Sequence, residues 1–392
     1  MQRWGNAMLL LEHDGKTLLA ARGLPTPKGV LIAPGEPPPA TLPGPGPWIA
    51  KSQVATGGRG KAGGVRLCRD RAQLEAACAD LATLRIKGHE PRGLRIEAAI
   101  SGAQEAYLGF SLDAARGQVI VMATDRGGVD VEAAGDDLPR VFADLSAEAI
   151  GAAVIRLAEA LPANLRRPIR EAGVICARAF CEMDALLVEI NPLFVFPDGR
   201  WIAGDVRFVA DESALVRQPE IAALVDEKPQ SYPDAAFKKT HGYDLVVVDP
   251  EGEIGLVTTG AGLSMKLIDE MTAQGLKPFN FCDIRSGGMR GDSSRLIEAL
   301  RRIGEGPRMR CVLVNIFAGI TDLGLFAEIL VNALRASPDM RLPLVVRLAG
   351  NGEDRAEVVL RESGLPMMIE RDLERAVELC ATAGVVQGAA HA

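Results

Sequence analysis

The sequence predicts an α/β protein in two parts, because two kinds of hydrophobic pattern meet within it. Before residue 225 the chain shows hairpin-like strands and amphipathic helices, whereas after residue 243 short apolar strands alternate with helices. Regular alternation favours a parallel sheet with helices on both faces. The patterns meet at a break rich in Pro and charged residues. We therefore expect domains at 1–230 and 244–392, joined by a linker at 231–243.

The composition is that of a globular protein with a substantial core, because 48% of the 392 residues are hydrophobic. A net charge of −7 argues against a nucleic-acid partner, and no apolar run is long enough for a membrane span. The seven cysteines lack CxxC spacing, which predicts reduced thiols without a zinc site or disulfides. The four histidines lie far apart, which favours surface or capping roles. We expect a cytoplasmic protein with no nucleic-acid or membrane partner.

Local signals place the elements of the first part. Residues 24–47 are crowded with Pro and Gly, which indicates an irregular connection. The strand-like segment Trp48-Ile49-Ala50 follows directly. Residues 146–163 repeat apolar side chains, among them Ile155 and Leu161, with a period of about 3.6 residues. This segment is predicted to be an amphipathic helix.

A glycine-rich loop, QVATGGRGKAGGV at residues 53–65, comes after the strand. Glycine lets backbone N–H groups approach phosphate oxygens, and Lys51, Arg59 and Lys61 add positive charge. The loop lacks the ending and spacing of a Walker motif. At this point a phosphate-binding loop and an ordinary turn both stay open.

Two carboxylates form a second candidate nucleotide contact. Glu97 and Glu105 flank the short loop Ile100-Ser101-Gly102. Carboxylates so placed can accept hydrogen bonds from ribose hydroxyls or from an adenine amino group. The alternative interpretation is that both are ordinary surface charges.

A candidate metal site lies in a β-hairpin predicted at residues 185–203. Glu189 and Asn191 are two residues apart, so they share a face of the strand. A turn centred on Asp198 sets Asn191 opposite Asp205. A carboxylate and an amide carbonyl are hard oxygen ligands, suited to a Mg²⁺ that also holds nucleotide phosphates. A solvated hairpin with ordinary polar residues is the alternative.

The second part contains two strand ends that carry glycine, at 258–262 and 315–321. Each is followed by a helix, whose free N-terminal amides attract anions. In one parallel sheet, two such ends predict a crevice at the carboxyl edge, although ordinary strand–helix turns would look similar. The expected strands are 245–248, 254–257, 311–316 and 344–348, and the expected helices are 262–274, 323–335, one from about 353, and 372–382.

Four motifs in this order resemble the β subunit of succinyl-CoA synthetase. They are QVATGGRGKAGGV (53–65), VEINPL (188–193), GAGLSM (260–265) and VNIFAGI (314–320). The resemblance implies an N-terminal ATP-grasp domain built of two α+β subdomains. It also implies a flavodoxin-like, doubly wound CoA-ligase domain that docks a CoA-binding α subunit.

The resemblance further implies a set of site residues and a reaction. ATP or GTP, CoA and a carboxylic acid would give acyl-CoA through an acyl phosphate and a phosphohistidine on the α subunit, with Glu189 steadying that histidine. Asn191 and Asp205 would bind Mg²⁺. The implied nucleotide contacts are Lys51, Gly58, Arg59, Gly60, Glu97, the backbone of Ile100, and Glu105.

The second part departs from the family pattern where the organic acid is held. Thr259 stands where the family usually has Asn, and Arg285 enters a usually glycine-rich loop. In the loop 318–324 the usual arginine is gone and Asp322 adds an acid. We expect succinate or a related dicarboxylate, with a hydroxylated acid such as malate as the leading variant. The candidate substrate residues are Thr259, Arg285, Gly319, Ile320 and Thr321.

Two other functions remain open from the sequence. A non-catalytic nucleotide-binding paralogue could act as a regulatory or assembly partner, although joint retention of Glu189, Asn191 and Asp205 favours an enzyme. A stand-alone ATP-grasp ligase is disfavoured, because the second part resembles the half that docks an α subunit.

Overall fold

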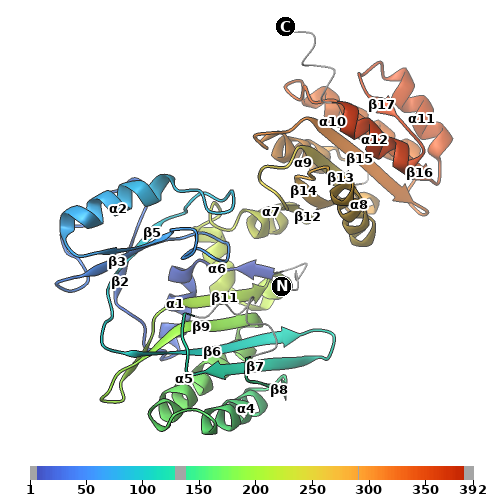
Figure 1. Ribbon diagram of the computed structural model, residues 1–392. Helices are drawn as coiled ribbons and strands as arrows, with labels where there is room; N and C mark the ends of the chain where they lie inside the picture. Colours follow the sequence, from blue (N-terminus) through green and yellow to red (C-terminus); the bar gives the residue numbers. More distant parts are fainter. Residues whose placement is uncertain (1–6, 129–137, 290, 384–392) are drawn as a thin grey trace. The chain divides into compact units, whose positions relative to one another are not determined.

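A computed structural model describes residues 7–128, 138–289 and 291–383 (Figure 1). Contacts between residues divide the chain into two compact units, Met1–Tyr232 and Pro233–Ala392. No described helix combines the length and apolar character needed to cross a membrane. Each unit is considered by itself below.

The first unit is built around an antiparallel sheet of seven strands. Six strands follow the order β1-β11-β9-β6-β7-β8, and β10 extends the pairing of β9. Side chains alternate between buried and less buried along β9, as expected for a strand with one face on the core. The strands are β1 (Ala7–Leu9), β6 (Gln104–Asp113), β7 (Gln118–Thr124), β8 (Arg140–Asp144), β9 (Ala185–Val195), β10 (Trp201–Ala203) and β11 (Val206–Asp211).

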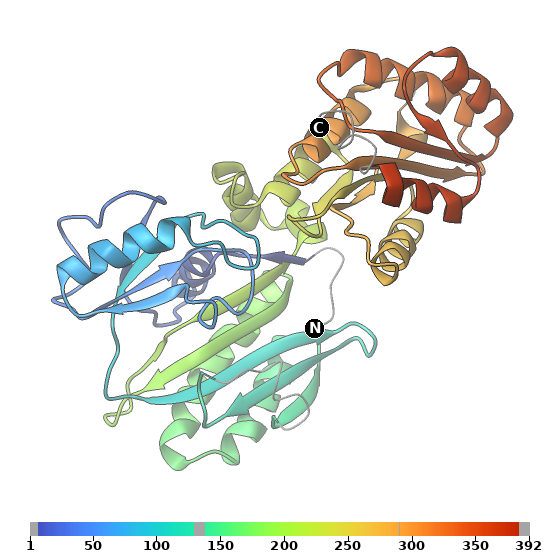
Figure 2. The same cartoon turned by 45° about the horizontal axis from the view of Figure 1, so that its top comes forward.

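Two helices cover one face of this sheet, α4 (Ala147–Glu159) and α5 (Ala163–Glu182) (Figure 2). Ser146 caps α4 by accepting a hydrogen bond from the Ala149 N–H at 3.1 Å. The helix predicted at 146–163 therefore begins as expected but ends earlier, because Pro162 supplies no N–H donor to continue it. Ile155 was expected on its apolar face, but it is exposed. Other described helices of the unit are α1 (Glu12–Ala21), which contacts β11, η2 (Glu212–Arg217) and α6 (Pro219–Glu227).

A smaller antiparallel sheet in the same unit has the order β2-β5-β3-β4. Helix α2 (Arg71–Thr83) packs on this sheet (Figure 1). Its contact residues include Leu74 and Leu81, which are fully buried. This second layer carries the glycine-rich loop, between β3 and β4. The two layers agree with the two α+β subdomains expected of an ATP-grasp fold. The strands are β2 (Gly29–Ile32), β3 (Trp48–Ser52), β4 (Val65–Cys68) and β5 (Leu94–Ala98).

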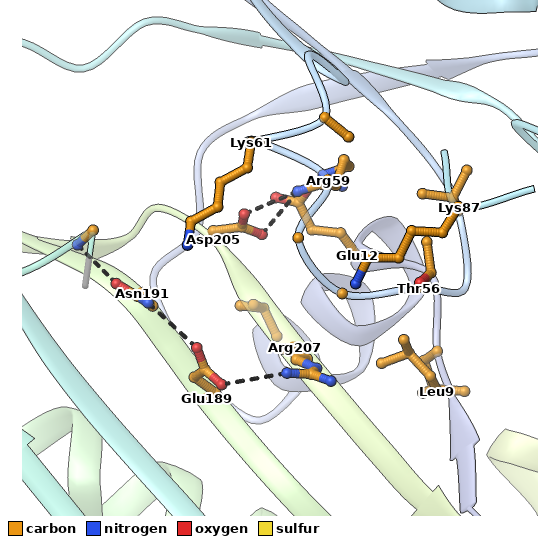
Figure 3. A pocket seen from close by; sticks show the side chains of 18 residues that line it. Leu9, Glu12, Thr56, Arg59, Lys61, Lys87, Glu189, Asn191, Asp205 and Arg207 are labelled. Carbon is orange, nitrogen blue, oxygen red and sulfur yellow. Dashed lines mark hydrogen bonds and ion pairs between the residues drawn. The ribbon is translucent and has the colours of Figure 1, made fainter. Parts of the chain in front are cut away.

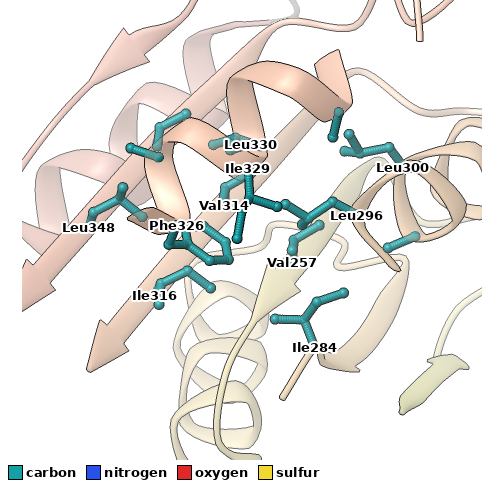
Figure 4. Close-up of a cluster of buried hydrophobic side chains, with 14 of the residues drawn as sticks. Val257, Ile284, Leu296, Leu300, Val314, Ile316, Phe326, Ile329, Leu330 and Leu348 are labelled. Atoms are coloured by element: carbon teal, nitrogen blue, oxygen red, sulfur yellow. The ribbon is translucent and has the colours of Figure 1, made fainter. Parts of the chain in front are cut away.

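The second unit contains the predicted parallel sheet, with strand order β13-β15-β16-β17. Side chains of successive β15 residues pack alternately into two different hydrophobic cores. Val312 and Val314 pack with α9, α10 and α11, and Figure 4 shows Val314 within this cluster. Leu313 packs with α8 and α12. Helices on both faces confirm the doubly wound prediction. The elements are β13 (Ile254–Thr258), α8 (Ala261–Ala273), α9 (Ser294–Gly304), β15 (Cys311–Ala318), α10 (Leu323–Ala336), β16 (Leu344–Gly350), α11 (Glu353–Glu362), β17 (Met368–Ile369) and α12 (Leu373–Ala383).

The first strand of this unit differs from the expectation. Strand β12 (Asp244–Val247) was placed in the parallel sheet, but it pairs antiparallel with β14 (Asn280–Asp283). Most of its residues are only half-buried, as suits a strand outside the central sheet. The segment 231–243, expected to be a linker, contains helix α7 (Pro233–His241), which packs on β12 and buries Phe237. A short 3₁₀ turn, η3 (Ser286–Gly288), follows β14.

The end of the first unit is tied to its first helix. The Tyr232 hydroxyl donates to the Asp14 carboxylate at 2.6 Å, and it accepts from the Leu11 N–H at 3.2 Å. Lys228 also pairs with Asp14, at 2.5 Å. These contacts give a physical reason why the first unit extends to residue 232.

Candidate functional site

In the hairpin formed by β9, β10 and β11, the strands pair in one register that is centred on the turn residue Asp198. Trp201 pairs with Val195, and Arg207 pairs with Glu189, so partners lie at equal distances from the turn. Between these pairs, the Asn191 N–H donates to the backbone oxygen of Asp205 at 3.1 Å. The predicted opposition of Asn191 and Asp205 is confirmed.

Side chains on this hairpin form a short polar chain (Figure 3). Asn191 Nδ2 donates to Glu189 Oε1 at 3.3 Å, and Glu189 Oε2 lies 4.0 Å from Arg207. Asn191 Oδ1 accepts a hydrogen bond from the Gly128 N–H at 2.8 Å. Glu189 and Asn191 thus share a face, as their spacing predicts.

A cavity of about 620 Å³ lies between this hairpin and the glycine-rich loop (Figure 3). Its lining includes six predicted site residues, namely Gly58, Arg59, Gly60, Glu189, Asn191 and Asp205. Lys61 and Lys87 add positive charge, and Figure 3 shows Lys61 extending toward Asp205. Strand order thus brings together a basic, glycine-rich loop and a set of oxygen donors from distant parts of the sequence.

Arg59 connects the two sides of the cavity. Its guanidinium donates to both carboxylate oxygens of Asp205, at 3.1 and 2.9 Å, and lies 2.7 Å from Glu12 Oε2. Burial alone would raise the pKa of Glu12, but Arg59, Lys16 and Lys51 hold that pKa well below its usual range. Glu12 is therefore a buried anion that holds three cations.

Behind Glu12 lies a buried network of ion pairs. Lys16 Nζ is 2.6 Å from both Glu12 and Glu97, and Lys51 Nζ is 2.8 Å from Glu12 and 3.0 Å from Glu97. Both lysines also donate to the backbone oxygen of Gly204, at 2.8 and 2.9 Å. The acidic partners raise the pKa of Lys51 against the effect of burial. Lys51 and Glu97, both predicted nucleotide contacts, take part in this network and are not among the described residues that line the cavity.

Sequence reasoning missed Glu12 and Lys16. Their i, i+4 spacing at the start of a helix is typical of exposed ion pairs, so the sequence held no signal that they are buried. His13, expected in a surface or capping role, is half-buried, and its Nδ1 lies 2.7 Å from the Arg95 guanidinium. Arg95 in turn donates to Glu97.

Ile100 and Glu105 are two further predicted nucleotide contacts outside the lining of this cavity. Ile100 follows β5 and is half-buried, and neither it nor Glu105 is among the described residues that line the cavity. Glu105 is exposed at the start of β6, where its backbone oxygen accepts from the Gly127 N–H at 3.2 Å. Its carboxylate lies beside Gly128, which does line the cavity.

The donors at the hairpin suit a magnesium ion. Asn191 offers an amide oxygen and Asp205 a carboxylate, and Mg²⁺ commonly takes one or two protein oxygens and completes its shell with water and phosphate. Among the described residues no group of three His, Cys, Asp or Glu side chains forms a metal cluster. The residues therefore fit a metal that arrives with a nucleotide better than an ion held by the protein alone.

The second unit has a cavity of about 360 Å³ at the carboxyl ends of β13 and β15. It brings together all five residues predicted to bind the organic acid. They come from three loops, after β13, β14 and β15. The lining residues are Thr259, Arg285, Ser286, Gly287, Phe317, Ala318, Gly319, Ile320 and Thr321.

Polar contacts link these loops. Ser286, a lining residue that sequence reasoning missed, donates from its buried hydroxyl to Thr259 Oγ1 at 3.4 Å. Asp283 Oδ1 accepts from the Gly260 N–H at 2.9 Å and from the Arg285 N–H at 3.3 Å. Asp322, the acid added to the loop 318–324, caps α10 by accepting from the Leu325 N–H and is not among the described residues that line the cavity.

Comparison with known proteins agrees with this architecture. Residues 9–195 match the family model of the ATP-grasp domain, and residues 257–379 match that of the CoA-ligase domain. The fold and the cavities thus define an ATP-grasp protein with an attached CoA-ligase unit.

Proteins of similar sequence identify the family within this class. The β subunit of succinate–CoA ligase (ADP-forming) from Burkholderia mallei (strain SAVP1) is 32% identical over 396 residues, which cover 95% of this chain and 98% of the relative. The same subunit of Paraburkholderia xenovorans (strain LB400) is 32% identical over 386 residues, covering 95% and 97%. The chain belongs to the family of succinate–CoA ligase β subunits.

A solved structure shares the fold at lower identity. ATP citrate lyase from Methanothrix soehngenii, in complex with citrate and coenzyme A, superposes with a TM-score of 0.68 at 18% identity. The match covers 96% of this chain and 99% of that one. At this identity the likeness supports the fold alone.

Proposed function

We propose that the chain is the β subunit of an acid–CoA ligase that couples cleavage of ATP, or GTP, to acyl-CoA formation from a dicarboxylic acid. The observation that carries the proposal is the opposition of Asn191 and Asp205 on the hairpin, with Arg59 of the glycine-rich loop bound to Asp205 at the same cavity. Two oxygen donors beside a basic glycine-rich loop suit a Mg²⁺–nucleotide complex.

The nucleotide half would act mainly by positioning charge. Gly58 and Gly60 let the loop backbone approach the phosphates, and Arg59 supplies a cation. Lys51, Glu97, Ile100 and Glu105 are proposed contacts of the rest of the nucleotide. Mg²⁺ held by Asn191 and Asp205 would neutralise negative charge on the phosphates. Arg59 would leave Asp205 for the phosphates while keeping its contact with Glu12.

The phosphoryl group would pass through a partner. A histidine nitrogen on a CoA-binding α subunit attacks the terminal phosphorus and ADP leaves. The phosphoryl group next moves to the organic carboxylate, and the CoA thiolate displaces phosphate from the resulting acyl phosphate. Among the residues that the structure describes, no histidine lines either cavity, which supports the need for a partner. Glu189 would steady that histidine from the hairpin.

The second cavity would hold the acid. Arg285 lies on its lining and can pair bidentately with a substrate carboxylate. The hydroxyls of Thr259, Ser286 and Thr321 supply hydrogen bonds that a hydroxylated acid such as malate can use. The backbone of Gly319 and Ile320 completes the pocket.

The test is phosphoryl transfer from γ-labelled ATP in purified proteins. This chain alone should give no ligase turnover, and addition of its CoA-binding partner should label that partner on histidine. Glu189→Gln should lower labelling while Mg·ATP binding persists. Full ligase activity from this chain alone would refute the two-subunit proposal. Mg·ATP binding without transfer to any partner would instead support a non-catalytic regulatory role.

A further inference from the structure

We propose that Asp244 is a positioning residue that orients Arg285 toward the acid in the second cavity. The inference rests on the function proposed above, since it presumes that Arg285 pairs with a substrate carboxylate. Asp244 does not line the cavity, so it would act through Arg285 and not by contact with the acid.

The geometry is a chain of three alternating charges. Arg285 donates from one terminal nitrogen to Asp244 Oδ2 at 2.9 Å. The other carboxylate oxygen, Oδ1, lies 2.7 Å from Lys238 Nζ on helix α7. Asp244 stands at the first position of β12, directly opposite Asp283 of β14. Asp244 and Asp283 therefore both lie where the loop that carries Arg285 begins.

Exposure explains why Arg285 needs a positioning partner. Its side chain is 53% exposed, whereas that of Asp244 is only 18% exposed. A long, half-exposed side chain loses rotamer entropy when it binds a ligand. Asp244 fixes the guanidinium before the acid arrives, and Asp283 fixes the Arg285 backbone through its N–H. That backbone is left-handed, with φ of 50°.

The charge balance shows why Asp244 orients Arg285 without neutralising it. Lys238 and Asp244 together carry no net charge, so the three-residue chain keeps one positive charge. A guanidinium has five N–H donors, and the contact with Asp244 uses one terminal nitrogen. Arg285 thereby keeps both the charge and the donors that a carboxylate requires.

The experiment is a double-mutant cycle on the complete ligase, the chain with its α subunit, assayed with malate and with succinate. Asp244→Asn should raise the KM for the acid about two- to fivefold, the range of a half-exposed ion pair, with little change in the KM for ATP or in kcat. Asp244→Glu should restore part of the loss. In the Arg285→Ala background, Asp244→Asn should have no further effect.

The control is Glu253→Gln, which breaks a comparable ion pair with Arg310 in the same unit, away from the cavity lining. It should leave the KM for the acid unchanged. A lower KM in Asp244→Asn would mean that Asp244 competes with the substrate, and it would overturn the inference. So would an equal effect of Asp244→Asn with and without Arg285. If Arg285→Ala itself leaves the KM unchanged, the proposed acid site is wrong.

Discussion

Arg59 and Asp205, far apart in sequence, form a two-oxygen ion pair with N–O distances of 3.1 and 2.9 Å at the edge of the first cavity. Asp205 is also a proposed magnesium ligand. A divalent cation bound to this carboxylate would repel the Arg59 guanidinium and compete with it for the oxygen lone pairs. We therefore expect metal binding and the Arg59–Asp205 ion pair to compete.

Replacement of Asp205 should distinguish its role as a metal ligand from its ion pair with Arg59. Asp205→Asn should weaken Mg·ATP binding about 10- to 100-fold, because a charge-assisted contact is lost. Binding of ATP in EDTA should not weaken, since Arg59 gains freedom to face the phosphates. Calorimetry with and without Mg²⁺ measures both. Asp198→Asn, at the exposed turn of the same hairpin, is the matched control and should behave as wild type. Equal losses with and without metal would argue against the ligand assignment.

Gly204 should tolerate no side chain. A Cβ built there lies 2.2 Å from Phe194 Cε2 and 3.0 Å from the Pro192 oxygen. Gly204→Ala should lower the free energy of unfolding by about 1–3 kcal/mol, as overpacking does. It should also weaken nucleotide binding, because the Gly204 carbonyl holds Lys51. Gly151→Ala, in helix α4 with no atom within 4 Å of the new Cβ, should stabilise by roughly 0.5–1 kcal/mol. Chemical denaturation compares the two.

Thr259 should influence the choice of acid. Thr259→Val keeps the shape but removes the hydroxyl that accepts from Ser286. The ratio of kcat/KM for malate to that for succinate should fall about three- to tenfold, the effect of one hydrogen bond. Ser286→Ala should act in the same direction. Thr272→Val, on the exposed face of α8, serves as control. An unchanged ratio in both pocket variants would exclude these hydroxyls from acid recognition.

His13 should make stability depend on pH. Burial and the Arg95 charge lower its pKa from the ordinary 6.5 in the folded state. The unfolded state then binds more protons near pH 6, so the free energy of unfolding rises with pH and falls below about pH 6.5. His13→Gln should flatten this dependence by up to about 1 kcal/mol between roughly pH 5.5 and 7.5. Denaturation at several pH values measures it, with His241→Gln as control. An identical slope in the His13 variant would contradict the expectation.

The sequence by itself determined the hairpin and the order of motifs. Turn chemistry at Asp198 and the two-residue period of a strand place Asn191 opposite Asp205, because both depend on near neighbours in the chain. Glycine-bearing strand ends similarly predicted the crevice that contains Thr259 and Thr321, because parallel strands end at one edge.

Only the tertiary structure decided which charges meet and how deeply they are buried. Glu12 and Lys16 show the spacing of a surface pair, yet they join Lys51 and Glu97, two proposed nucleotide contacts, in a buried network. Asp322, the acid that enters the loop 318–324, caps helix α10. The reason is physical: local spacing fixes the face on which a side chain lies. The partner and the dielectric surroundings of a charge depend on segments that folding brings together from far along the chain.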